Sequence, residues 1–203
     1  EAFAITNEED GIGGYDWNPD ATRIAFTKTE SDSKKEKSAK ERYGAFGIEW
    51  EEYKLSHLWV INFNIDSILH AGLLPCYEEK ADSSSNKKLA PCFKLPKASR
   101  LTEGKFTVTG FSWSPDGKQI AFNRQPDPLI NSSSRSDIAI VSVEDKLIKT
   151  IVSNPGADFL QNWHPEGKSI LYSSAVNDTI SNYYKNNRTF IYALASGTTR
   201  EIL

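Results

Sequence analysis

GFSWSPDGKQIAF, residues 110–122, reads as two short strands joined by a tight turn. Pro115 sets φ for a turn, and residues 116–117, Asp-Gly, can supply the positive φ that a two-residue hairpin loop requires. Trp113 ends the first strand, and the apolar residues 120–122 begin the second. The stretch therefore predicts a β-hairpin.

The same pattern occurs twice more, as YDWNPDATRIAF at residues 15–26 and as QNWHPEGKSILY at residues 161–172. A Trp, a Pro, an acid and an apolar triplet recur at fixed offsets. Trp113 and Trp163 are 50 positions apart, and a repeat of this period is typical of propellers and solenoids. The first copy has Ala21 where the other two have Gly, so we expect its turn to be longer or of another type.

Each hairpin is followed by a long apolar strand and then by a short strand. The long strands are predicted at residues 58–63, 137–143 and 189–194, and the short ones at residues 100–102, 149–152 and 199–203. Four strands in succession are the layout of a propeller blade. We therefore expect an all-β fold, a partial β-propeller with about three four-stranded blades, at residues 1–64, 99–152 and 153–203. The alternative is a self-contained β-sandwich, and the three repeated units argue against it.

Two insertions, residues 28–55 and 65–98, account for the longer interval between the first and second hairpins. Three blades cannot close a propeller, for which about four to eight are typical, so we expect the chain to be part of a larger polypeptide. The 203 residues include no Met, which fits either a removed leader or a fragment.

The charge and hydropathy of the chain argue against two kinds of partner. The formal net charge of −3 does not provide the broad positive surface typical of proteins that bind nucleic acid. No apolar run approaches the roughly 20 residues that span a bilayer.

The first insertion has the pattern of a helix. Ser33 and Glu36 have the spacing of a capping box, residues 34–42 are rich in helix formers, and Gly44 is a suitable stop. Glu36 and Lys40 are spaced for a favourable i,i+4 ion pair. We expect a helix here, either a solvated surface helix or a recognition helix.

The same insertion carries acids among aromatic side chains. Glu49, Glu51 and Glu52 interleave with the apolar residues Phe46, Ile48, Trp50 and Tyr53. Aromatics beside clustered acids could hold a cation, such as the amino terminus of a peptide. The alternative is a loop that packs its aromatics on the edge of the domain.

The second insertion contains both cysteines, Cys76 and Cys92. In an oxidising compartment they could close a loop of about 15 residues, which is worth roughly 3 kcal/mol in the chain-entropy model. The alternative is two free thiols on the surface. The two cysteines and His70 would supply only three of the four ligands of a structural zinc site. We therefore expect neither a metal nor another cofactor.

No catalytic constellation is recognisable in the sequence. The nucleophile elbow Gly-x-Ser-x-Gly, the zinc motif His-Glu-x-x-His and the Walker phosphate loop are all missing. His57 precedes a predicted strand and His164 occupies a hairpin turn, so both are expected to be structural. We therefore expect no catalytic residue within this chain, which leaves open whether the parent protein is an enzyme.

Longer stretches of the sequence resemble one family of enzymes. The stretches are RYG at residues 42–44, EYKLSHLW at 52–59, QPDPLIN at 125–131, NPGADF at 154–159 and NYYKNNR at 182–188. They are similar to the propeller of bacterial serine peptidases of the prolyl oligopeptidase family, in its dipeptidyl-peptidase and acylaminoacyl-peptidase branch. The resemblance covers nearly the whole chain apart from residues 65–98.

The resemblance implies a propeller followed by an α/β-hydrolase domain beyond residue 203, which would hold the catalytic Ser, Asp and His. The propeller would gate access of short peptides to that domain and help to hold their amino ends. Dipeptidyl peptidases use a Glu pair on a propeller insertion for this purpose, and Glu51 and Glu52 form such a pair, although their surrounding sequence departs from that motif. A periplasmic or secreted location is expected, with a cytoplasmic one and a homo-oligomer left open. The alternative function is a non-catalytic propeller that binds protein or glycan in a bacterial envelope, and the sequence beyond residue 203 decides between the two.

Overall fold

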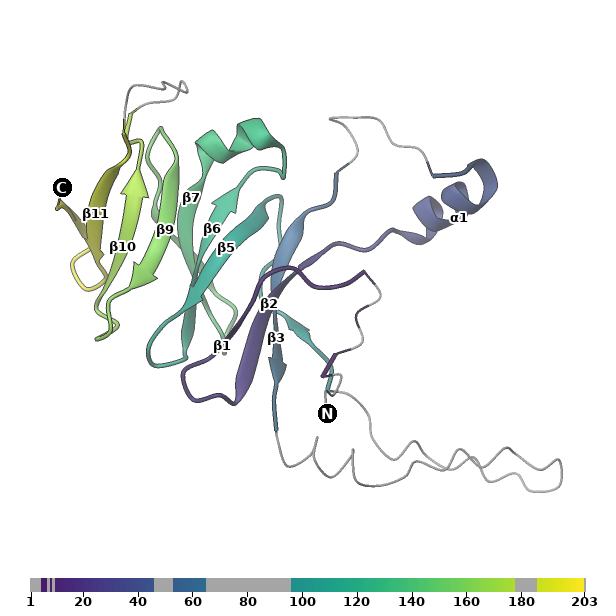
Figure 1. Ribbon diagram of the computed structural model, residues 1–203, viewed down its shortest axis with the longest axis horizontal. Coiled ribbons are helices and arrows are strands. Elements are labelled where there is room, and N and C mark those ends of the chain that lie inside the picture. Colours follow the sequence, from purple (N-terminus) through teal and green to yellow (C-terminus); the bar gives the residue numbers. More distant parts are fainter. Residues whose placement is uncertain are drawn as a thin grey trace.

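The computed structural model describes residues 5–6, 8, 10–45, 53–64, 96–177 and 186–202. Within these residues the chain forms three four-stranded antiparallel sheets that follow one another along the molecule (Figure 1). The first sheet contains β1 (Tyr15–Trp17), β2 (Arg23–Thr29), β3 (Ser56–Asn62) and β4 (Ser99–Arg100). The second contains β5 (Thr107–Trp113), β6 (Gln119–Gln125), β7 (Asp137–Ser142) and β8 (Ile148–Val152). The third contains β9 (Asp158–Trp163), β10 (Ser169–Ser174), β11 (Arg188–Ala193) and β12 (Thr198–Glu201).

The strand order of each sheet follows the chain, so each sheet is a simple meander. This confirms the predicted fold class, with four strands to a blade and three blades. The pairing of β4 with β3 places Ser99 and Arg100 in the first sheet. The boundary between the first and second blades therefore lies after Arg100 and not before residue 99. A β-sandwich of two packed sheets is ruled out by the three separate sheets.

All three hairpins close with the same turn, which corrects two predictions. Gly117 has a φ of 66° and donates its backbone N–H to the carbonyl of Ser114 at 2.9 Å. Ala21 adopts a φ of 56° and donates to Asn18 at 3.0 Å, so the expectation of a longer or different first turn was wrong. The loop is also longer than the two residues predicted. The paired strands end at Trp113 and Ile120, which are in direct register, and the backbone N–H of Ser114 donates to the carbonyl of Gln119.

Side chains explain why an alanine is tolerated in this left-handed position. The carboxylate of Asp20 accepts hydrogen bonds from the backbone of Thr22 at 2.9 Å and from Asn18 Nδ2 at 2.6 Å. The side-chain oxygen of Asn18 accepts a further bond from the backbone of Arg23 at 2.8 Å. The turn at Gly117 has the counterparts of these bonds, made by Ser114 and Asp116, so the same side-chain positions hold both turns, although a non-glycine residue in this conformation costs about 1–2 kcal/mol.

Neighbouring blades are joined by a repeated contact that we call the indole bridge. Trp113 on the second sheet donates its indole N–H to the carbonyl of Asp16 on the first, at 3.2 Å. Trp163 on the third sheet donates to the carbonyl of Ser112 on the second, at 3.0 Å. In both cases the acceptor is the residue that precedes the tryptophan of the blade before. The hairpin repeat therefore sets how one blade packs on the next.

The second and third sheets are also joined by a buried polar contact. Asn123 Nδ2 donates to the carbonyl of Asp158 at 2.9 Å, and Asn123 Oδ1 accepts from the backbone of Leu160 at 3.2 Å. The backbone of Asp158 in turn donates to the carbonyl of Ser136 at 2.7 Å, just after the 3-10 helix η1 (Ile130–Arg135). Because each of these buried groups has a partner, the contact fixes the two blades without a desolvation penalty.

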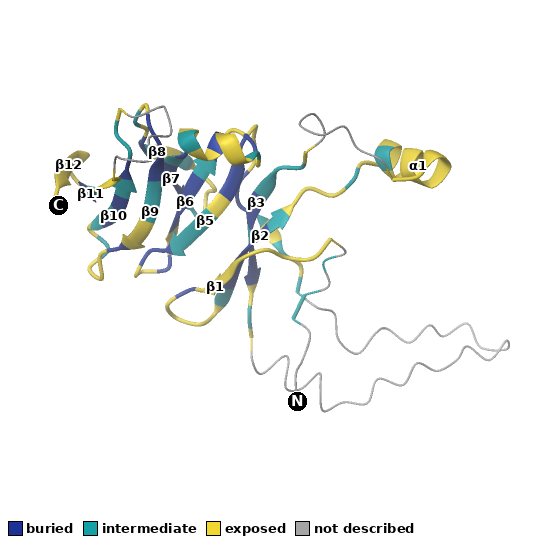
Figure 2. Cartoon of the chain, turned by 45° about the horizontal axis from the view of Figure 1, so that its top comes forward, coloured by how far each residue is buried: buried dark blue, intermediate teal, exposed yellow. Residues whose placement is uncertain are grey.

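The first insertion forms the helix α1 (Lys34–Tyr43), which projects from the first blade and has no buried residue (Figures 1 and 2). Its capping box at Ser33 and Glu36 and its end at Gly44 confirm the prediction. The predicted ion pair between Glu36 and Lys40 was wrong, because Lys40 pairs with Asp32 at 2.6 Å and Glu36 pairs with Lys54. No helix among the described residues is long and apolar enough to cross a membrane.

Candidate functional site

The root of the projecting helix borders a pocket of about 450 Å³, which we call the arm-root pocket. Its lining comes from the end of β2, the start of α1, the beginning of β3 and the short strand β4. The lining residues are Lys28, Thr29, Glu30, Ser31, Ser33, Glu36, Lys54, His57, Trp59 and Arg100. A volume of this size lies within the range of small-molecule sites.

His57 lies at the base of the pocket with its side chain completely buried. Its Nδ1 atom is 3.2 Å from the hydroxyl oxygen of Thr102, which also accepts a hydrogen bond from the backbone of Leu58 at 2.9 Å. The Thr102 hydroxyl therefore has its proton free to donate to Nδ1, and this assignment places the imidazole proton on Nε2. Burial, and next the nearby Arg100 guanidinium, lower the pKa of His57 to about 4, so the ring is neutral at pH 7.

The buried Nε2 atom of His57 has no hydrogen-bond partner. The nearest carboxylate oxygen that faces it belongs to Glu30, at 3.6 Å. Glu30 is held by Arg100, whose Nη2 atom donates to it at 2.9 Å while its Nε atom donates to the carbonyl of Thr102 at 2.8 Å. The base of the pocket therefore presents an imidazole N–H donor beside an ion pair.

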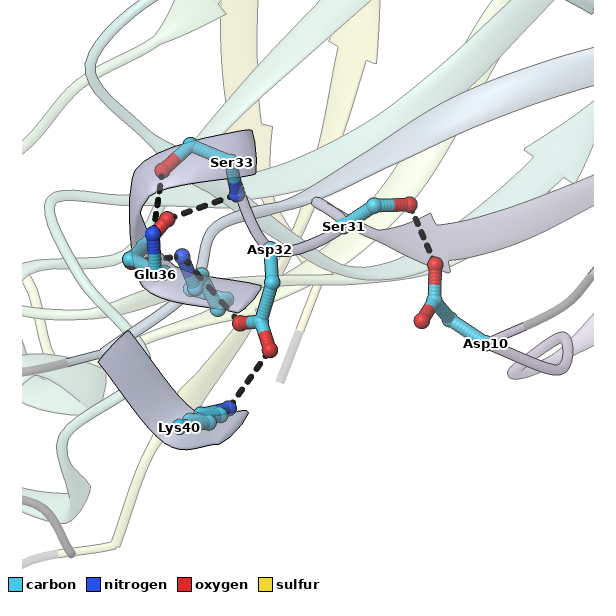
Figure 3. A network of polar contacts seen from close by, with 7 residues as sticks. Asp10, Ser31, Asp32, Ser33, Glu36 and Lys40 are labelled. Atoms are coloured by element: carbon cyan, nitrogen blue, oxygen red, sulfur yellow. Dashed lines mark hydrogen bonds and ion pairs between the residues drawn. The ribbon is translucent and has the colours of Figure 1, made fainter. Parts of the chain in front are cut away.

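The side of the pocket nearest the helix is built from a second group of charges. Figure 3 shows Ser33 and Glu36 bonded to each other at the helix start, with Asp32 reaching Lys40. Lys54 pairs with Glu36 and lies 3.6 Å from Asp32. The hydrogen bond from Lys54, followed by that from Ser33, lowers the pKa of Glu36 to about 2, so its carboxylate stays charged under ordinary conditions.

The third wall is aromatic and basic. Lys28 places its ammonium group 5.3 Å from the centre of the Trp59 ring, a cation–π contact, and also pairs with Glu8. In total, three cations and two acids line the pocket beside an indole face. Such a lining can bind a small group of either charge, with acids for an ammonium and with Arg100 and Lys28 for a carboxylate.

The structure does not report on every residue that the sequence singled out. Glu49, Glu51 and Glu52, as well as Cys76 and Cys92, lie outside the described residues. In the sequence, Glu51 and Glu52 precede the pocket residue Lys54 by three and two positions. Among the described residues, no group of three or more His, Cys, Asp or Glu side chains is placed to hold a metal ion.

Sequence reasoning missed the group formed by Glu30, His57 and Arg100. His57 was interpreted as structural, and its burial in β3 agrees with that interpretation. Arg100 and Glu30 are 70 positions apart, and the pairing of β4 with β3 brings them together. The only local signal was the high charge of the residues that flank the helix.

Comparison with known proteins identifies the fold. No family model and no curated relative matches the sequence. Among solved structures, TolB from Acinetobacter baumannii matches 97% of this chain and 33% of its own length, with 13% identity and a TM-score of 0.51. An acylaminoacyl peptidase from Pyrococcus horikoshii matches 97% of this chain and 25% of its own, with 13% identity and a TM-score of 0.53. The chain forms part of a β-propeller.

A third similar structure is a puromycin-hydrolysing peptidase from Mycobacterium tuberculosis, with 11% identity, a TM-score of 0.53, and coverage of 95% of this chain and 23% of that one. The chain thus spans 23–33% of the length of these three proteins. Identities of 11–13% establish the shared fold. The structures similar to this chain include both peptidases and TolB.

Proposed function

We propose that this chain is the propeller part of a serine peptidase that cleaves short peptides. In this proposal the propeller gates access to an α/β-hydrolase domain beyond residue 203 and helps to position the substrate. The observation that carries the proposal is the arm-root pocket, whose acids, cations and indole face suit the end of a peptide. Two solved peptidases that contain the same fold support it. The proposal also draws on the resemblance of short stretches, such as EYKLSHLW at residues 52–59, to the dipeptidyl-peptidase and acylaminoacyl-peptidase branch of the prolyl oligopeptidase family.

The first insertion would hold the amino end of the substrate. Glu51 and Glu52 directly precede a segment that lines the pocket, and Glu36 is a charged carboxylate on its wall. Charge-assisted hydrogen bonds to an ammonium are worth about 1.5–3 kcal/mol each. The N–H of His57 and the guanidinium of Arg100 would then donate hydrogen bonds to carbonyl or carboxylate oxygens of the same peptide.

A binding experiment on the 203-residue chain tests this role. A short peptide with a free amino end and its N-acetylated form are titrated by calorimetry, and we expect the free form to bind at least about tenfold more tightly, or 1.4 kcal/mol. The double variant E51Q/E52Q should lose this preference. The matched control E41Q removes an exposed acid from helix α1 in the same insertion and should keep this preference. Equal affinities for the two peptides in the unmodified chain would refute the role.

The peptidase assignment itself is tested on the parent protein. The parent should hydrolyse aminoacyl or dipeptidyl chromogenic substrates, and a serine-directed fluorophosphonate should label it outside residues 1–203. The isolated chain should do neither. Labelling within residues 1–203 would overturn the assignment, and a parent that is not labelled at all would favour the non-catalytic propeller.

A further inference from the structure

His57 carries a buried hydrogen-bond donor that no other described residue uses. Its side chain is completely buried, and its Nε2 atom has no hydrogen-bond partner. Buried polar groups are nearly always paired in folded proteins, because an unpaired donor keeps the full cost of its desolvation. His57 also lines the arm-root pocket. A ligand in this pocket can therefore gain a hydrogen bond that the described protein groups leave unmade.

The surroundings of His57 fix Nε2 as a donor. The hydroxyl of Thr102 accepts from the backbone of Leu58 at 2.9 Å and faces Nδ1 at 3.2 Å, so its own proton belongs to Nδ1. The carboxylate oxygen of Glu30 lies 3.6 Å from Nε2, which is too long for a hydrogen bond. The N–H donor therefore lies close to a carboxylate without being bonded to it.

A group that fits between Nε2 and Glu30 must accept from the first and donate to the second. An ammonium group has no lone pair for the N–H, and a carboxylate would meet the like charge of Glu30. A carbonyl oxygen satisfies His57 but has no proton for Glu30. A hydroxyl group does both, since it carries lone pairs and one proton. The pair formed by His57 and Glu30 is therefore suited to a hydroxyl.

The two members of this pair differ in how firmly they are held. The imidazole of His57 is fixed by Thr102 and by an edge-to-face contact with Phe106 at a centroid distance of 5.3 Å. The side chain of Glu30 is 40% exposed, and that of its partner Arg100 is 32% exposed. Ion pairs with this much exposure contribute little energy. The carboxylate of Glu30 can therefore move outward to admit one oxygen atom while the imidazole stays in place.

We propose that His57 and Glu30 recognise a side-chain hydroxyl of the substrate, so that the pocket prefers short peptides with Ser or Thr as the first or second residue. The inference rests on the proposed function for the peptide itself and divides the peptide's oxygens between two donors. His57 donates to the hydroxyl, whose proton goes to Glu30, and carbonyl or carboxylate oxygens are left to Arg100.

The size of the pocket sets the position of the hydroxyl along the peptide. Glu36, one of the acids proposed for the amino end, lines the same pocket of about 450 Å³ as His57 and Glu30. The hydroxyl therefore belongs to a residue at or next to the amino end. A site built for a hydroxyl discriminates against the analogue that lacks it, because the polar groups of the site are then left unpaired.

Titration calorimetry with matched peptides tests the proposal. Thr-Ala-Ala is compared with Val-Ala-Ala, and Ala-Thr-Ala with Ala-Val-Ala, because Thr and Val differ by a hydroxyl in place of a methyl group. We expect the 203-residue chain to bind the Thr peptide at least about tenfold more tightly at one of the two positions. His57→Phe keeps an aromatic ring without the N–H and should bind both members of each pair equally. The matched control His164→Phe, in an exposed hairpin turn, should keep the preference.

An NMR measurement on the unmodified chain tests the same contact if His57→Phe does not fold. The Nε2 proton of His57 should exchange with water more slowly when the preferred Thr peptide is bound than when its Val counterpart is bound. Equal affinities within both peptide pairs, a hydroxyl preference that survives His57→Phe, or equal exchange with the two peptides would each overturn the inference.

The same titrations separate this inference from the proposed function. Acetylation of each peptide measures the preference for a free amino end. A chain that prefers free amino ends but binds Thr and Val peptides alike keeps the proposed amino-end role and refutes the hydroxyl site. A chain that binds none of the peptides refutes both.

Discussion

The buried histidine at the base of the arm-root pocket makes the stability of this propeller depend on pH in a defined window. The pKa of His57 falls from an ordinary 6.5 to about 4 in the folded protein. The unfolded chain therefore takes up a proton near pH 6.5, whereas the folded chain takes it up only near pH 4. Acidification thus favours unfolding. The free energy of unfolding begins to decrease as the pH falls below about 6.5, and the decrease is complete below about 4.

The size of the effect follows from the shift. Each pKa unit corresponds to 1.36 kcal/mol, so the full loss is about 3 kcal/mol, of which about 2 kcal/mol develops between pH 7 and pH 5. This window lies above the range in which Glu36, with a pKa of about 2, is protonated. The charged groups that act on His57 are Arg100, which opposes protonation, and Glu30 and Glu103, which favour it.

Urea unfolding at pH 7 and pH 5 measures this loss. The unmodified chain should lose about 2 kcal/mol more between the two pH values than His57→Gln, which keeps a polar side chain without a proton to gain. The matched control His164→Gln removes the histidine of an exposed hairpin turn. This variant should lose as much unfolding free energy between pH 7 and pH 5 as the unmodified chain. Equal losses of unfolding free energy between pH 7 and pH 5 in the unmodified chain and in His57→Gln would refute the reasoning. If His57→Gln does not fold, an NMR titration of His57 in the unmodified chain gives the pKa directly, and a value near 6.5 would refute it equally.

Three further predictions concern the hairpins, the helix and the indole bridge. Ala21→Gly should stabilise the chain by up to about 1 kcal/mol in urea unfolding, because it relieves a left-handed φ, whereas Gly117→Ala should destabilise it by a similar amount. Ser33→Ala removes the helix cap at a cost of about 1 kcal/mol, which should appear as faster amide exchange within α1 and leave global unfolding unchanged, since no residue of α1 is buried. Trp163→Phe should cost at least about 1 kcal/mol through loss of its bond to a backbone carbonyl, and Trp17→Phe should cost much less, because the Trp17 side chain is 41% exposed.

The features that the sequence predicted correctly are those with a local cause. A tryptophan, a proline and an acid at fixed offsets specify each hairpin within a few residues, and three copies of this pattern reveal the blades. The helix and its cap were likewise encoded by neighbouring residues. The error at Ala21 has a physical explanation: Asn18 and Asp20 hold this turn with the same kinds of bonds that Ser114 and Asp116 make in the second hairpin, so the turn type does not require a glycine.

The features that the sequence could not predict depend on contacts between distant segments. The ion pair expected between Glu36 and Lys40 gave way to Lys54, which returns to the helix only because β3 pairs with β2. The burial of His57 and its proximity to Arg100 require the short strand β4, which lies beyond a long insertion. Exposed ion pairs differ little in energy, so sequence spacing alone does not select among them.

The helix and the blades are held by different kinds of interaction, and this difference bears on how the pocket can respond to a ligand. The blades are joined by buried apolar clusters and by indole bridges. At its start the helix is held by ion pairs of Lys54 with Glu36 and Asp32 and of Lys40 with Asp32, and salt screens such pairs. In the proposed function, the ammonium group of a peptide would compete with Lys54 for Glu36, and we expect its binding to act on the helix while the blades keep their packing. The arm-root pocket therefore lies between blades that are joined by buried contacts and a helix that has no buried residue.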